Sequence, residues 1–282
     1  MKTRFLSIIA ISALAVACGE NTSHDNHSSA DSSSHEQTAP AEEVGAMADF
    51  KFHSMIANLP SPLQTFQIID NVDLSEKNIE LTPIAQASNL STNSSKAYGY
   101  GVYVTDMGFM AYQKQNQMTL EYLQACRTLA TDLGAGDVFD QTITKNFEEN
   151  SSEEAKFVRM MDEAFNEMDQ YMVNNERFIN ATEIFVGSWV ESQIIATKML
   201  LGVELSDENR PVYEGIYSQK MHASNLMNVL GEVDDQISKE IYASVEDLMM
   251  FYAGFSDIES ISQEDLNELH MKLEKLKAQL LA

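Results

Sequence analysis

The stretch Ser262-Gln-Glu-Asp-Leu-Asn-Glu-Leu-His-Met-Lys-Leu-Glu-Lys-Leu-Lys-Ala-Gln-Leu280 decides the fold class of this chain. Its leucines recur at steps of three and four residues, which places them on one face of an α-helix (Leu266, Leu269, Leu273, Leu276 and Leu280). Ser262 stands three residues before Asp265, the spacing of a side-chain cap at a helix start. The stretch therefore predicts an amphipathic helix that buries its leucine face.

Apolar residues recur with the same helical spacing over most of the chain before this stretch. Ser151-Ser-Glu-Glu154 has the form of a capping box. Apolar residues follow it at steps of three and four (Val158, Met161, Phe165, Met168 and Met172). We expect further long helices over residues 94–113, 115–133, 175–201, 206–230 and 233–252, and shorter ones from Pro60, over 76–88 and over 137–149. Glycines stand where several of these helices should stop (Gly134, Gly136, Gly202 and Gly231).

No segment alternates between apolar and polar residues in the way that a half-buried strand does. Val102-Tyr-Val-Thr105 has strand propensity, but it lies inside a helical pattern that we expect to prevail. The sequence predicts an all-α fold of about eight helices in a single helical domain, residues 51–282. Short connections favour antiparallel neighbours. Both an antiparallel helical bundle and an irregular array of helix pairs fit this pattern.

The N-terminus has the features of a lipoprotein signal peptide, residues 1–17. Met1-Lys-Thr-Arg4 is basic, and the apolar run from Phe5 to Val16 is too short to span a membrane. The run ends in Leu14-Ala-Val-Ala-Cys18, which resembles a bacterial lipobox, although Ala15 replaces the usual leucine. The resemblance implies cleavage before Cys18 and lipidation of that cysteine. The alternative is an ordinary secretory signal.

Residues 18–50 predict a disordered polar tether behind the lipidated Cys18, because they contain almost no large apolar side chain. Gly19 follows the cysteine in place of the aspartate linked to inner-membrane retention. We therefore expect an outer-membrane protein that faces the periplasm or the cell surface. The tether histidines fit a polar spacer better than a metal-binding tract, because nothing fixes their geometry (His24, His27 and His35).

The chain is strongly acidic, with a formal net charge of −25. It has no basic cluster, which argues against a nucleic acid as partner and against direct adsorption to anionic lipid. The expected partners are the membrane, through the lipid on Cys18, and a candidate envelope protein. Cys126 is the one cysteine beyond Cys18, and its helical face predicts a buried structural thiol. No cofactor and no metal site are expected.

The candidate pocket residues are polar or aromatic side chains inside the most apolar helices. Asp106 lies near Tyr103 in a segment rich in glycine and tyrosine, and Glu191 lies near Trp189, the only tryptophan. A buried carboxylate needs a partner or takes up a proton. The candidate partners by sequence are Lys96, Arg177 and Lys198. Tyr103, Asp106, Trp189 and Glu191 either line an internal pocket or form a polar pair that fixes helix register.

Three segments occur together in this chain: Leu59-Pro-Ser-Pro62, Tyr100-Gly-Val-Tyr-Val-Thr-Asp106 and Gly187-Ser-Trp-Val-Glu191. Together they resemble a family of uncharacterised all-helical lipoproteins of Bacteroidota. The resemblance covers roughly residues 55–230. It implies an all-helical fold and an envelope location, and it implies no activity.

The sequence contains no catalytic triad order, nucleophile elbow, phosphate-binding loop or dinucleotide fingerprint. We therefore expect a non-enzymatic binding or scaffold protein, anchored to the membrane of the bacterial envelope. The alternative is a small-molecule or metal-binding protein with an internal pocket around Asp106, Trp189 and Glu191. A hydrolase whose nucleophile and base are joined only by the fold is a third hypothesis.

Overall fold

The computed structural model describes residues 79–142, 154–175, 177–231 and 236–282. Cys18 and the segments predicted as a signal peptide, as a tether and as a helix from Pro60 lie outside the described residues. The same holds for Ser151 and therefore for the capping box predicted there.

All regular structure within these ranges is helical, and they contain no strand. The long helices are α3 (Asn93–Tyr112), α4 (Asn116–Asp132), α6 (Glu154–Asn174), α7 (Phe178–Leu200), α8 (Arg210–Leu230), α9 (Gln236–Ala253) and α10 (Gln263–Leu280). Two short 3-10 helices, η1 (Ile84–Asn89) and η2 (Ile258–Ser260), join them, and residues 136–142 form a further helical run. The predicted all-α class is confirmed, and Val102–Thr105 lies inside α3 as expected.

The C-terminal helix shows why the sequence pattern was decisive. Asp265 Oδ2 accepts from the Ser262 backbone N–H at 2.9 Å, and Ser262 Oγ accepts from the Asp265 N–H at 3.1 Å. The five leucines of the stripe are all buried (Leu266, Leu269, Leu273, Leu276 and Leu280). The cap satisfies backbone donors that the helix itself leaves free, and the stripe joins the core.

The prediction of an α-helix over residues 76–88 is wrong for the described part of that range. Residues 79–83 are extended, and only η1 is helical. Pro83 lacks an N–H and disfavours helical backbone at Thr82. The Thr82 backbone instead makes tertiary hydrogen bonds, since its N–H donates to Asp106 Oδ2 at 3.2 Å and its carbonyl accepts from Tyr122 at 2.8 Å.

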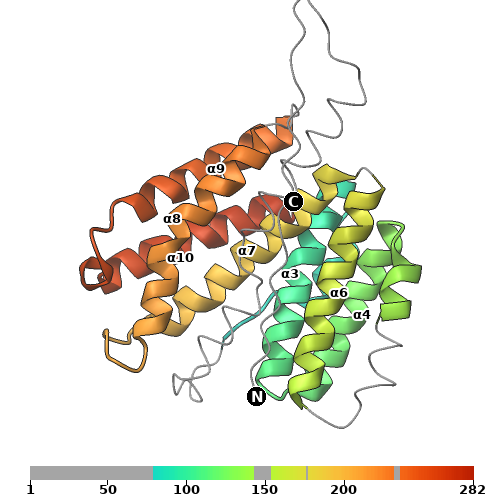
Figure 1. Cartoon of the computed structure of the whole chain (residues 1–282), viewed down its shortest axis with the longest axis horizontal. Helices are drawn as coiled ribbons and strands as arrows, with labels where there is room; N and C mark the ends of the chain where they lie inside the picture. Colours follow the sequence, from blue (N-terminus) through green and yellow to red (C-terminus); the bar gives the residue numbers. More distant parts are fainter. Residues whose placement is uncertain (1–78, 143–153, 176, 232–235) are drawn as a thin grey trace, which may run out of the picture. The chain divides into compact units, whose positions relative to one another are not determined.

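The described helices form two groups that share α7 (Figure 1). In one group, α4 and α6 pack against α3, and α3 makes its most extensive contact with α7. In the other, α7, α8, α9 and α10 form a ring in which each helix contacts the next. Every residue from Ala181 to Thr197 is buried as a result. Any charged or polar side chain in this stretch of α7 therefore lies in the core.

Two glycines bring the backbones of α3 and α7 into direct contact. A Cβ on Gly101 would overlap the backbone carbonyl of Ile184, and a Cβ on Gly187 would overlap that of Tyr98. Glycine costs a helix up to about 1 kcal/mol relative to alanine. The close approach of the two backbones explains why glycine is used at these positions. The same approach brings side chains of α3 and α7 into contact.

Within the described ranges, no helix combines the length and apolar character that a membrane crossing requires.

Candidate functional site

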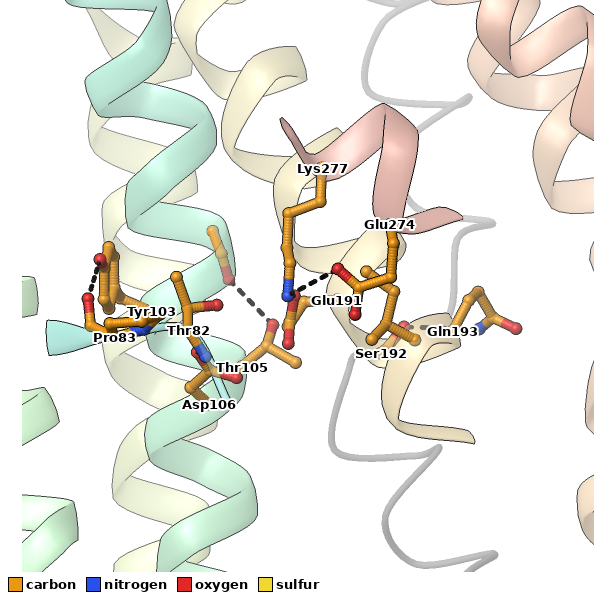
Figure 2. A network of polar contacts seen from close by, with 12 residues as sticks. Thr82, Pro83, Tyr103, Thr105, Asp106, Glu191, Ser192, Gln193, Glu274 and Lys277 are labelled. Atoms are coloured by element: carbon orange, nitrogen blue, oxygen red, sulfur yellow. Dashed lines mark hydrogen bonds and ion pairs between the residues drawn. The ribbon is translucent and has the colours of Figure 1, made fainter. Parts of the chain in front are cut away.

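The site begins with two carboxyl groups that meet at the contact between α3 and α7. Asp106 on α3 and Glu191 on α7 are both fully buried. Asp106 Oδ2 accepts the hydrogen bond from Thr82, while Oδ1 has no hydrogen-bond partner among the described residues. The two carboxyl groups are close enough to hydrogen-bond when one of them holds a proton. Figure 2 shows both side chains in the space between the helices.

Lys277 on α10 completes this cluster. Its Nζ lies 3.0 Å from Glu191 Oε2 and 3.7 Å from Glu274 Oε2 (Figure 2). The Lys277 side chain is 11% exposed, whereas Glu191 is fully buried. The fold therefore brings one ammonium group to two buried carboxyl groups.

The protonation of the cluster follows from this count of charges. Burial raises the pKa of Asp106 well above its usual value, and the neighbouring charge of Glu191 raises it further, while Lys277 opposes the rise. Burial alone would lower the pKa of Lys277, but Glu191, Glu274 and Asp106 raise it above its usual value. Asp106 therefore keeps its proton, and the charged Lys277 lies beside Glu191 in the buried cluster.

Two tyrosines hold the extended segment over this cluster. The Tyr103 hydroxyl donates to the Pro83 carbonyl at 2.9 Å, and the Tyr122 hydroxyl donates to the Thr82 carbonyl at 2.8 Å. Burial raises the pKa of both hydroxyls, so they act as neutral donors at physiological pH. Their hydrogen bonds fix Thr82 and Pro83 beside α3.

A cleft of about 330 Å³ opens between this segment and the end of α10. Its walls come from residues 80–86, from α7 and from the last turns of α10 (Glu80, Leu81, Thr82, Pro83, Gln86, Lys198, Glu274, Lys277, Ala278 and Leu281). Lys277 both lines the cleft and pairs with Glu191. The buried carboxyl pair is therefore one side chain away from a space that a small molecule can enter.

The structure brings together only some of the residues predicted as a pocket. Asp106 and Glu191 meet, and Tyr103 lies beside them with its hydroxyl on Pro83. Trp189 lies two residues before Glu191, a rotation of about 200° around the helix. Its indole N–H accordingly points away and donates to Gln219 Oε1 on α8 at 2.8 Å. None of the four predicted residues lines the cleft described above.

The ion-pair partner of the carboxyl pair differs from the three cations that proximity in sequence indicated. Lys96 pairs with Asp132 at 2.7 Å, Arg177 donates to the Leu133 carbonyl, and Lys198 lines the cleft. Sequence reasoning missed Lys277, which comes from α10. The available signal was its position four residues after Leu273 and three before Leu280, at the edge of the leucine face.

Two further expectations concern Cys126 and metals. Cys126 is fully buried with a free thiol, as predicted, and burial raises the pKa of that thiol. The part of the chain that the structure describes contains no group of three or more histidine, cysteine, aspartate or glutamate side chains placed to hold a metal ion. Comparisons of the chain with protein-family models, with curated proteins and with solved structures find no significant match.

Proposed function

We propose that this protein is a non-enzymatic binding protein of the bacterial envelope that holds a small molecule in the cleft beside Lys277. A lipid on Cys18 anchors it to the outer membrane. The observation that carries this proposal is the double role of Lys277, which lines the cleft and neutralises the buried Glu191.

Energetics favour a binding role for the cluster. Replacing a buried ion pair by apolar side chains of similar size is often neutral or stabilising. A core that needed only rigidity could therefore use apolar side chains here. Groups with strongly shifted pKa values beside a cleft are typical of functional sites. The volume of about 330 Å³ lies at the lower end of the range for small-molecule pockets.

The cleft also has the mixed lining that ligand sites use. Leu81, Pro83, Ala278 and Leu281 supply apolar surface, while the charged and polar side chains between them can fix a ligand's orientation. This lining points to a molecule of modest size with at least one charged group. A protein partner would need a broad surface, whereas this cleft has the volume of a small-molecule site.

The experiment is native mass spectrometry on protein extracted with mild detergent from its own membranes. Ala278 is exposed and lines the cleft, so Ala278→Trp fills the space without disturbing the core. Lys275→Trp is the matched control, because Lys275 is exposed on the same helix and does not line the cleft. The proposal predicts a small bound mass in the wild type and the control, and its loss in Ala278→Trp.

Two other results would contradict the binding role. If all three preparations contain only the protein itself, there is no bound ligand. If a bound mass persists in Ala278→Trp, the ligand binds outside the cleft. A second polypeptide in fixed ratio, in place of the small mass, would favour the scaffold role. The anchor has its own test, since Cys18→Ala should release the protein from the membrane fraction.

A further inference from the structure

We infer that the ligand of this cleft is a small zwitterion, with one carboxylate and one ammonium group on an apolar body. An amino acid with an apolar side chain is the simplest molecule of this class. The inference rests on the proposed function, because it names the ligand class of the same cleft. Its basis is that the described lining offers one unpaired charge of each sign, on Lys198 and on Glu80.

The charges of the lining are balanced, although those of the chain as a whole are not. The chain contains 43 aspartates and glutamates but only 18 lysines and arginines. The described lining nevertheless contains two lysines and two glutamates (Glu80, Lys198, Glu274 and Lys277). A purely anionic ligand would meet two carboxylates here, and a purely cationic ligand would meet two ammonium groups. The balance therefore favours a ligand that carries both signs.

Two of these four charges already have partners inside the protein. Lys277 Nζ lies 3.0 Å from Glu191 Oε2 and 3.7 Å from Glu274 Oε2 (Figure 2). A ligand that formed an ion pair with Lys277 or with Glu274 would have to compete with these contacts. Lys277 and Glu274 therefore serve as wall residues, and the charges open to a ligand are the other two.

Lys198 and Glu80 come from separate elements, and neither has an ion-pair partner among the described residues. Lys198 lies in the last turn of α7 and is half-buried, whereas Glu80 is exposed on the extended segment before η1. Burial lowers the pKa of His270, and the Lys198 charge lowers it further, so this ammonium group lies within electrostatic reach of α10. A ligand carboxylate can pair with Lys198, and a ligand ammonium group with Glu80, without breaking any ion pair that the structure shows.

The rest of the wall suits a small apolar body. Four apolar side chains line the cleft (Leu81, Pro83, Ala278 and Leu281). The volume of about 330 Å³ restricts the ligand to a small molecule. The hydroxyl groups of Tyr103 and Tyr122 fix the extended segment that forms one wall, which reduces the entropy lost when a ligand is bound.

The test is an NMR titration of the full-length protein with three probes that share one branched carbon chain. Leucine carries both charged groups, isocaproate lacks the ammonium group, and isoamylamine lacks the carboxylate. Leucine should bind saturably. Each of the other two probes should bind at least about tenfold more weakly, because it loses one charge-assisted hydrogen bond.

Two variants assign each charge of the ligand to one side chain of the cleft. Lys198→Met should remove the advantage of leucine over isoamylamine, because the carboxylate of leucine then has no cation to pair with. Glu80→Gln should remove the advantage of leucine over isocaproate for the corresponding reason. Lys275→Met is the control, since Lys275 is exposed on α10 and does not line the cleft, and it should leave all three affinities unchanged.

Three results would each overturn the inference. These are the failure of leucine to bind, an analogue that binds as tightly as leucine, and an advantage of leucine that persists in either variant. The proposed function would survive these outcomes if native extracts still carried a small mass lost in Ala278→Trp.

Discussion

The Lys277 ammonium group lies 3.0 Å from the buried Glu191 carboxylate, and the same side chain lines the cleft. Glu191 belongs to α7, the helix shared by both helix groups, so the cleft is connected to the centre of the fold through one ion pair. Any change at Lys277 should therefore alter both stability and binding.

Lys277→Met should destabilise the protein by about 3 kcal/mol near neutral pH, because it leaves Glu191 buried without a cation. Urea unfolding of the variant and of the wild type measures this loss. Lys275→Met is the control and should stay within about 0.5 kcal/mol of wild type. Equal losses in the two variants would show that the ion pair contributes nothing specific.

Asp106→Asn should flatten the pH dependence of stability. Burial raises the pKa of Asp106, so the folded state keeps a proton that the unfolded state releases above its usual value of 3.8. The contribution of Asp106 to the free energy of unfolding is therefore complete below that pH. It falls by up to about 1.4 kcal/mol per pH unit as the pH rises toward the raised pKa. The variant has no such proton to lose.

The measurement is the free energy of unfolding in urea across this pH range. The exposed Asp140 provides a control whose pKa shift has the opposite direction, since a hydrogen bond from Arg127 lowers the pKa of Asp140. Asp140→Asn should keep the wild-type decline with rising pH. Parallel curves for wild type and Asp106→Asn would refute the assignment of a proton to Asp106.

Gly101→Ala and Gly187→Ala should each destabilise the fold by about 3 kcal/mol or more, because the added methyl group overlaps a backbone carbonyl of the facing helix. Gly215 is the matched control, since it lies inside α8 and a Cβ there would meet nothing within 4 Å. Gly215→Ala should stabilise the protein by up to about 1 kcal/mol. Thermal unfolding of the three variants tests the close approach of α3 and α7. A loss of stability in Gly215→Ala alone would contradict that approach.

Cys126 should resist alkylation by iodoacetamide in the folded protein, because the thiol is fully buried and burial raises its pKa. Peptide mass mapping before and after addition of urea follows the reaction at this residue. Labelling should appear only in urea. Equally fast labelling of the folded protein would place the thiol at the surface.

The sequence predicted the long helices well, because their apolar residues follow one period and their ends carry caps and glycines. Ser262 and the leucine stripe of α10 are the clearest example. Asp106 and Glu191 were recognisable as acids inside apolar helices. Their meeting depends on Gly101 and Gly187, whose role as contact points requires knowing which helices pair.

Other features of the site depend on tertiary contacts that no local pattern contains. In the sequence, Lys277 is an ordinary charged residue near the end of a helix. Its place in the site follows only from the packing of α10 against α7. The extended backbone at Thr82 is held by side chains of Asp106 and Tyr122, so helical propensity over residues 76–88 was misleading. Trp189 was grouped with Glu191 by proximity in sequence, although a spacing of two residues places them on opposite sides of a helix.

The most direct test of the central claim is a crystal structure of the protein purified from its own membranes without exchange of bound molecules. The account predicts a small molecule in the cleft, in contact with the Lys277 side chain. A cleft that contains only water, or a ligand bound at a different place, would contradict it.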